Sequence, residues 1–309
     1  CPVYHHPLEE CIVHRKGIFC TALSALLFGV TPLLGRLTYG MGSNALTLTF
    51  YRNALVILPI FLLLRLRKIS LRISPRQLAT VLAVGILGRG FTTLMLYDSY
   101  RFVGIGIATT LHFLYPVFVA VLCRVVFHDR LGRVRLAALV LAGIGVLCFL
   151  ERDSGPVSGA GLALATISGF TYACYMVCTE KTVIREMDPL VVSFYMAIGV
   201  SCAMLAVHIP TRQIVFALPP KAMLLTLLVA LCTSFLGVVL FQIGICYLSA
   251  TTAAIFSLLE PIASNLCGIL VLSEPVTPAK ALGSLIILAA VFLMARFKPA
   301  EAADPAAAE

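Results

Sequence analysis

Charged residues are scarce in this chain, and tryptophan is absent. Of its 309 residues 12% are charged, against roughly 25% in an average soluble domain. This scarcity, together with 60% hydrophobic residues, excludes a sizeable soluble domain. A mean hydropathy of +1.01 is typical of an integral membrane protein. Without tryptophan, the aromatic residues at the membrane surfaces must be tyrosine and phenylalanine.

The sequence also lacks the motifs of nucleotide-driven pumps and of intramembrane enzymes. It contains no G-x-x-x-x-G-K-[ST] loop, no G-x-S-x-G turn and no H-E-x-x-H pair. The 11 cysteines are an odd number with no C-x-x-C pair, which indicates neither a disulfide framework nor a zinc site. The net charge of +9 comes from short loops between apolar runs, so it reports topology rather than nucleic-acid binding. The sequence therefore predicts no cofactor, no metal and no nucleic-acid partner.

Long apolar runs fill the chain instead, and a membrane-spanning helix needs about 20 such residues. We expect ten spanning helices, over residues 17–38, 45–66, 78–99, 104–127, 133–150, 160–180, 189–209, 221–246, 250–273 and 279–296. The other expected parts are a polar N-terminal segment at 1–16, a linker at 151–158 and a disordered tail at 297–309.

The positions of lysine and arginine orient the expected helices. The two most basic loops lie at 65–76 and 124–135. Because basic loops stay on the cytoplasmic side, we expect both termini in the cytoplasm. The protein is therefore expected to be a multi-pass protein of the cell membrane.

The two halves of the chain, 17–150 and 159–296, resemble each other after a shift of 144–145 residues. The aligned segments are Phe28-Gly29 with Tyr172-Ala173, Phe50-Tyr51 with Phe194-Tyr195, and Leu114–Val117 with Leu259–Ile262. Each half has five expected helices, an odd number, so the second half is inverted relative to the first. The predicted fold class is an all-α integral membrane protein with ten transmembrane helices in two inverted five-helix repeats. Secondary transporters use this construction, with the substrate site near the midplane.

These residues resemble the EamA family of the drug/metabolite transporter superfamily, whose chains have ten helices in two halves. The likeness covers about 17–296. It is carried by Phe28-Gly29, Phe50-Tyr51-Arg52, Leu114–Val117, Leu259–Ile262 and Ser273-Glu274. The resemblance implies export or exchange of small metabolites, amino acids among them. The chain departs from the family at His128-Asp129-Arg130, where Gly-Glu is usual, and at Arg89, which belongs to no family motif.

Glu260 lies near the middle of the ninth expected helix and is followed by Pro261. A carboxylate at the bilayer centre costs at least about 2.5–3.5 kcal/mol, so such residues usually face the protein interior and carry function. The proline frees a backbone carbonyl that protein or water must satisfy, which favours a polar cavity. Two interpretations stay open. Glu260 binds the substrate or a proton, or it locks two helices together.

Two arginines also fall within expected spans. Arg89 lies at the middle of the third expected helix between two glycines, and Arg52 lies nearer the outer surface. An isolated arginine at the midplane is costly, so Arg89 should have a partner. We hypothesise that Arg89 pairs with Glu260 in one state and with a substrate carboxylate in another. A structural ion pair is the alternative. Arg52 either takes part in gating or binding, or extends towards the headgroups.

Five more polar residues complete the candidate set, namely Tyr97, His112, Tyr115, Gln242 and Ser257. His112 and Tyr115 share one face of the fourth expected helix, and they align with Ser257 and Glu260 in the other half. The inverted repeat would place these two faces opposite each other. For His112 a satisfied core histidine is the alternative. Tyr97 and Gln242 align with each other in the two halves, and we expect both near the pocket. Tyr172 and Tyr175 are expected to be core residues.

Together these patterns predict a secondary transporter that works by alternating access rather than an enzyme. Two buried arginines against one buried glutamate indicate an anionic or zwitterionic, amino-acid-like solute, moved by export or exchange. The expected partners are this small-molecule substrate and the lipid bilayer. A homodimer is compatible with the sequence, which does not set the oligomeric state. A membrane scaffold or sensor without transport activity is the alternative function.

Overall fold

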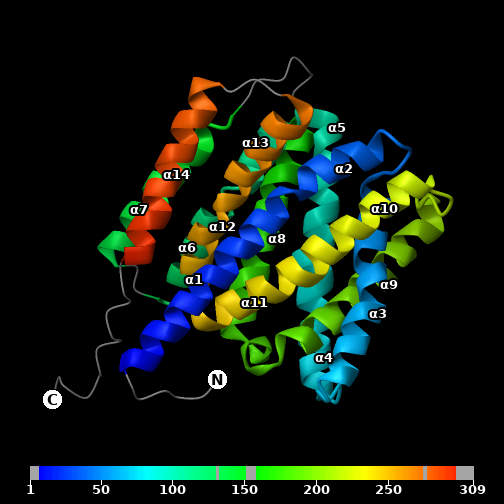
Figure 1. The fold of residues 1–309 in the computed structure, drawn as a ribbon, viewed down its shortest axis with the longest axis horizontal. Helices are drawn as coiled ribbons and strands as arrows, with labels where there is room; N and C mark the ends of the chain where they lie inside the picture. Colours follow the sequence, from blue (N-terminus) through cyan, green and yellow to red (C-terminus); the bar gives the residue numbers. More distant parts are fainter. Residues whose placement is uncertain (1–6, 130–131, 151–157, 274–276, 297–309) are drawn as a thin grey trace.

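A computed structural model describes residues 7–129, 132–150, 158–273 and 277–296, and of residues 7–13 and 272 the backbone alone. The expected linker at 151–158 and tail at 297–309 fall almost wholly outside these residues, as does the family motif residue Glu274. The described chain is helical throughout, with turns between the helices (Figure 1). Its α-helices are α1 (Pro7–Gly29), α2 (Thr31–Tyr39), α3 (Ala45–Leu66), α4 (Pro75–Gly85), α5 (Phe91–His112), α6 (Tyr115–Val125), α7 (Arg133–Leu147), α8 (Gly159–Lys181), α9 (Pro189–Thr211), α10 (Pro220–Val229), α11 (Val238–Tyr247), α12 (Ala250–Ser257), α13 (Leu259–Leu272) and α14 (Pro278–Arg296). Three short helices of other types are η1 (Ile86–Gly90), η2 (Val183–Glu186) and η3 (Ala230–Gly237).

Eight helical runs in the described residues are long and apolar enough to cross a membrane. One of them, Pro75–His112, has 38 residues, but Gly104 within it has φ 73° and ψ 162°. A side chain beyond hydrogen is strained in that conformation, so the glycine lets the chain turn where the sequence predicts a break between helices. The shorter helices α6 and α7 occupy the remaining predicted spans. The structure thus shows a multi-pass helical protein.

Several predicted spans are interrupted rather than continuous. α1 begins at Pro7, earlier than the predicted start at 17, and Val30 separates it from α2. Phe113 and Leu114 separate α5 from α6, and Leu258 separates α12 from α13. Proline lies at the first or second position of α2 and α6 and at the third of α13, where its missing N–H disturbs no helical bond. The predicted face around Glu260, built on an unbroken helix, therefore does not continue through Leu258.

Two segments of wider, π-helical geometry lie at matching positions in the two halves. η1 runs from Ile86 to Gly90 and η3 from Ala230 to Gly237. Residues 89 and 234, which lie in these segments, are 145 positions apart. Single turns of π-helix occur often at functional sites because they displace side chains from the regular helical pattern. These two segments bring Arg89 and Ser234 towards the centre of the molecule.

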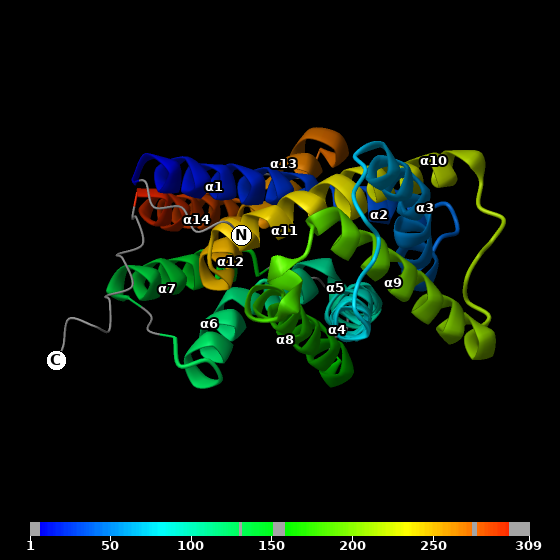
Figure 2. The same cartoon turned by 90° about the horizontal axis from the view of Figure 1, so that it is seen from below.

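Close pairs of helices connect the two halves of the chain. α7 and α14 lie side by side at one edge in both views, and α3, α9 and α10 lie at the opposite edge (Figures 1 and 2). α5 packs along α8, and α1 packs along α11. Two tyrosine hydrogen bonds repeat the correspondence, because Tyr51 donates to the Phe216 carbonyl at 3.3 Å and Tyr195 donates to the Leu71 carbonyl at 2.8 Å. The fold is a two-repeat helical bundle.

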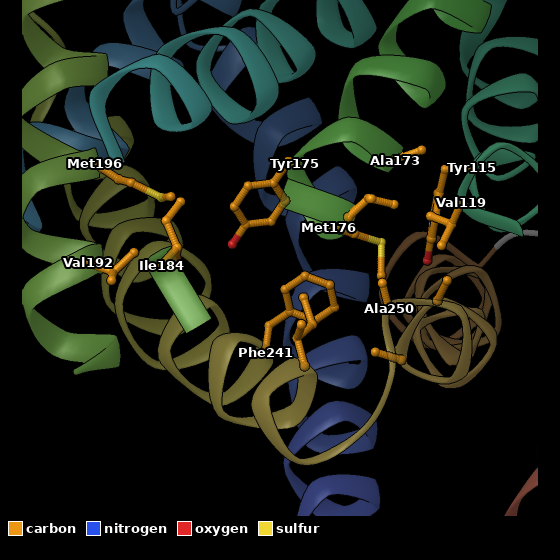
Figure 3. Packing of buried hydrophobic residues seen from close by; sticks show 14 of the residues in the cluster. Tyr115, Val119, Ala173, Tyr175, Met176, Ile184, Val192, Met196, Phe241 and Ala250 are labelled. Carbon is orange, nitrogen blue, oxygen red and sulfur yellow. The ribbon is translucent and has the colours of Figure 1, made fainter. Parts of the chain in front are cut away.

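The largest buried cluster lies where α8, α9 and α11 meet. Figure 3 shows Tyr175 and Phe241 near its centre, with Met196 and Ile184 on one side and Tyr115 on the other. The hydroxyl of Tyr175 points towards the Met196 side. The nine cysteines whose side chains the structure describes are free thiols. This aromatic cluster forms one wall of the cavity described below.

Candidate functional site

A cavity at the centre of the bundle holds three charged side chains. Its volume is about 80 Å³ for the centres of water-sized molecules, which is room for several waters or a small solute. The charged residues that line it are Arg52, Arg89 and Glu260. Its other lining residues are Phe28, Thr31, Pro32, Thr92, Thr93, Leu96, Tyr97, Tyr100, Thr109, His112, Phe113, Tyr172, Tyr175, Val238 and Phe241. The chain therefore forms a central cavity with a net positive lining.

Each guanidinium nitrogen of Arg52 on α3 donates to a neighbouring side chain. Its Nε donates to Ser234 Oγ at 2.8 Å, its Nη1 to Tyr97 Oη at 3.0 Å and its Nη2 to Thr233 Oγ1 at 3.0 Å. Only 6% of the residue is exposed. Arg52 therefore does not extend to the headgroups, and it joins α3 to α5 and η3.

Arg89 on η1 is equally buried, at 8% exposed, but weakly engaged. Its Nη2 reaches the Ser234 carbonyl at 3.5 Å, and its Nη1 has no hydrogen-bond partner among the residues that the structure describes. Neighbouring helices fill the space beside its two flanking glycines, since Gly88 packs against Tyr175 and Gly90 packs against Val200. A buried cation without a full set of partners is costly, so this nitrogen is a ready donor for an anion in the cavity.

Glu260 lies in the first turn of α13, two residues after the break at Leu258. Its carboxylate forms no hydrogen bond or ion pair with the residues that the structure describes, although Arg52 is near enough to act on it electrostatically. The predicted Arg89–Glu260 ion pair is accordingly not formed in this conformation. Gly29 on α1 brings the two helices together here, because a Cβ on it would lie 2.5 Å from Ala263 Cβ and 2.8 Å from the Glu260 carbonyl oxygen. This close approach explains why the Phe28-Gly29 pair needs glycine.

Two further candidates line the cavity beside the charged residues. Tyr97 accepts the bond from Arg52, and its ring packs edge-on to Tyr39. His112 is the last residue of α5, and its Nδ1 lies 3.0 Å from Oγ of Ser168 on α8. That bond satisfies one ring nitrogen, so His112 combines the predicted cavity position with the alternative of a bonded core histidine.

Three candidates lie outside the residues that line the cavity. Tyr115 is fully buried behind it, and its hydroxyl forms no hydrogen bond within the described part of the chain. Ser257 Oγ donates to the Ala253 carbonyl of its own helix at 2.9 Å. Gln242 accepts from Ser193 at 3.3 Å and contacts Met196 Sδ at 3.8 Å. These contacts are those of packing residues that support the cavity wall.

Several residues that shape the cavity were not predicted from the sequence. Thr31, at the start of α2, is 5% exposed, and its hydroxyl has no hydrogen-bond partner in the described ranges. Tyr172, Tyr175 and Phe241 form a wall of rings whose planes lie within 24° of one another and whose centroids are 5.7–6.1 Å apart. The break before Thr31-Pro32 was a usable signal. The wall of rings gave no such signal, because aromatic residues on a membrane helix are usually packed in the protein core.

Two larger hollows adjoin the central cavity on one side. The first, of about 730 Å³, shares Thr31, Pro32, Tyr97 and Tyr100 with it and extends to the end of the bundle at Asn44. The second, of about 310 Å³, lies between α2, α5, α13 and α14 and shares Pro32, Thr109 and Phe113 with the central cavity. The larger hollow therefore borders the cavity on the side of the helix ends near residues 39–44.

At the opposite helix ends, polar bonds join the elements. Glu180, 8% exposed at the end of α8, accepts from the Ala250 backbone N–H at 2.5 Å where α12 begins. Lys181 lies 3.3 Å from Glu180 and 2.6 Å from Asp129. Asp129, which departs from the family motif, thus connects the loop after α6 in the first half with the end of α8 in the second half. In this conformation these bonds close the side of the bundle that carries the basic loops.

Comparisons with known proteins agree with this architecture. The model of the EamA-like transporter family matches residues 15–150 and again 159–296. Two uncharacterized transporters of Archaeoglobus fulgidus are similar, one 24% identical over 73% of this chain and 80% of the relative, the other 26% identical over 90% and 96%. An uncharacterized transporter of Synechocystis is 27% identical over 65% of this chain and 61% of the relative. A solved crystal structure matches with a TM-score of 0.78 at 14% identity, covering 90% of this chain and 96% of that chain, which supports the fold.

Proposed function

Because the chain belongs to the EamA-like transporter family, we propose that it is a secondary active transporter of a small anionic or zwitterionic, amino-acid-like metabolite. Membership of the family and the transporter relatives make it a membrane transporter. The proposal adds the substrate class, the central cavity as the substrate site and alternating access as the mechanism, with export or exchange as the direction.

One observation carries the substrate class. The same cavity contains an unpartnered guanidinium nitrogen on Arg89 and a carboxylate on Glu260 without a hydrogen bond to the described residues. Charged groups in a low-dielectric interior bind most strongly to a ligand that offers the opposite charge. A carboxylate would bind at Arg89, and an amino group would bind at Glu260. The aromatic wall and the small volume favour a compact solute.

The arrangement of the helices supports alternating access. Ten crossings in two inverted repeats, over 17–150 and 159–296, would place the substrate site between the halves. The broken helices, 145 residues apart at His112 and Ser257, lie around the cavity. Alternating access requires a state that is open on one side and closed on the other. The hollow towards residues 39–44 fits the open side, and the bonds of Glu180 and Lys181 fit the closed side. Both termini would then lie in the cytoplasm, and a homodimer is not required.

A scaffold or sensor is the competing function, and flux separates the two. Purified protein in liposomes would be loaded with unlabelled protein amino acids and exposed to a ¹⁴C-labelled mixture of the same amino acids. We expect accumulation of label above that in protein-free liposomes, and competition by unlabelled amino acids but not by their amides. Parallel runs with labelled sugars and nucleosides define the class. Label that binds without entering the lumen would support a sensor, and flux of sugars alone would refute the charge argument.

A further inference from the structure

The two arginines of the cavity have different surroundings. Every guanidinium nitrogen of Arg52 donates to a side chain at 2.8–3.0 Å, whereas Arg89 makes one long contact and keeps Nη1 without a partner. Both arginines reach the same residue, since Arg52 bonds Ser234 Oγ and Arg89 contacts the Ser234 carbonyl. Ser234 therefore connects the two guanidinium groups.

We propose that Arg52 is a positioning residue that acts on Arg89 through Ser234, and that the substrate anion binds Arg89 alone. This inference rests on the proposed function for the existence of a transported anion. Arg52 holds the π-helical segment η3 by two neighbouring hydroxyls, Thr233 and Ser234, and so fixes the carbonyl that orients Arg89. Three of the five N–H groups of Arg52 are engaged, whereas Nη1 of Arg89 has no hydrogen-bond partner among the described residues, so Arg89 is the better donor to an anion.

The geometry of guanidinium makes this role specific to arginine. Its planar fork can hold three acceptors in fixed directions, here two on η3 and Tyr97 on α5, and a lysine ammonium cannot reproduce that arrangement. A π-helical segment departs from the regular hydrogen-bond pattern, so external bonds help to define its position. Because a buried site must be held within a fraction of an ångström, a loosened η3 would misplace Arg89.

The matching position in the other half carries no such clamp. Residue 196, which lies 144 positions after Arg52, is a methionine, and its sulfur contacts Gln242 at 3.8 Å in the place that corresponds to Tyr97. Methionine adapts its shape readily and fixes a neighbour less strictly. The guanidinium bonds of Arg52 therefore hold η3, whereas the corresponding segment η1 carries Arg89, the more weakly bonded arginine. The repeat has thus divided positioning and recognition between its two halves.

A chemical test needs no substrate. The protein in liposomes is treated with 2,3-butanedione and borate, and modification of each arginine is followed by peptide mass spectrometry. Since a hydrogen bond to a charged group is worth a factor of about ten or more, we expect Arg89 to react at least about tenfold faster than Arg52. Ser234→Ala should raise the rate at Arg52 by about tenfold. Ser201→Ala, which removes a buried hydroxyl bonded within α9, is the matched control and should change neither rate. Equal rates at Arg52 and Arg89 in the unmodified protein would overturn the inference.

Transport of the labelled amino-acid mixture gives the second test. Ser234→Ala and Tyr97→Phe, which keep the cavity shape, should each raise KM about tenfold with little change in the maximal rate. Arg52→Gln combined with Arg89→Gln should be no weaker than Arg89→Gln alone, because Arg52 acts through Arg89. A double variant weaker by the full effect of Arg52→Gln would show that Arg52 binds the substrate itself. If no label enters at all, the proposed function fails, and the modification rates still decide the role of Arg52.

Discussion

The close approach of α1 and α13 at Gly29 gives a prediction whose size follows from the structure. In Gly29→Ala the new Cβ would lie 2.5 Å from Ala263 Cβ, whereas ordinary contacts begin at 3.4 Å. The two helices must therefore separate locally by about 0.9 Å (3.4 − 2.5). The Glu260 carbonyl oxygen at 2.8 Å and the Ser264 backbone nitrogen at 3.0 Å block the other directions. Overpacking of this kind costs about 1–3 kcal/mol.

Gly143→Ala on α7 is the matched control, because nothing lies within 4 Å of its added Cβ. Both variants gain up to about 1 kcal/mol of helix propensity, so their difference isolates the overpacking. At about 2–4 °C per kcal/mol, we expect Gly29→Ala to unfold roughly 5 °C below Gly143→Ala. Without tryptophan, unfolding in detergent is best followed with a thiol-reactive dye, since Cys20 and Cys123 are buried in the folded protein. Equal unfolding temperatures at one heating rate would refute the close packing of α1 against Glu260.

Three further predictions test the other parts of the account. Gly104→Ala should be less stable than Gly143→Ala by roughly 1–3 kcal/mol, because a φ of 73° with a ψ of 162° suits glycine. The same dye assay would show this as a lower unfolding temperature. Equal unfolding temperatures would argue for a continuous helix at this point. Glu260→Gln should leave the unfolding temperature unchanged or raised while it abolishes exchange of amino acids, since the carboxylate has no bonded partner among the described residues, and a lowered temperature would favour the helix-lock interpretation. Lys181→Gln should raise the alkylation rate of the buried Cys123, read by peptide mass spectrometry, by about fivefold, because loss of about 1 kcal/mol frees the basic side to open. An unchanged rate would mean that these bonds do not close that side.

The sequence predicted the class and the general design of the protein because these depend on composition and spacing. Apolar runs, basic loops and a repeat of about 145 residues led to a multi-pass membrane protein with two halves, and the resemblance of short motifs added the EamA family of transporters. The boundaries of α3 were predicted to the residue, at 45–66. The break at Gly104 also lies at the edge of a predicted turn, since a short polar stretch there separates two apolar runs.

What the sequence could not predict depends on side-chain direction within broken helices. Arg52 and Arg89 look alike as isolated charges in apolar runs, and only their hydrogen bonds distinguish a clamp from a free donor. The π-helical segments leave no mark in hydropathy, so the meeting of both arginines at Ser234 was not foreseen. The ring wall of Tyr172, Tyr175 and Phe241 was hidden for the same reason.

The central claim is that a substrate carboxylate binds Arg89 in a cavity from which the protein transports it. The most direct measurement is counterflow of the ¹⁴C-labelled amino-acid mixture in liposomes that contain the unmodified protein or Arg89→Gln, with unlabelled amino acids or their amides as competitors. We expect counterflow by the unmodified protein that amino acids inhibit and amides do not, and counterflow in Arg89→Gln that is at least about tenfold weaker and no longer prefers free carboxylates. Counterflow that persists in Arg89→Gln with the same preference for free carboxylates would contradict the claim.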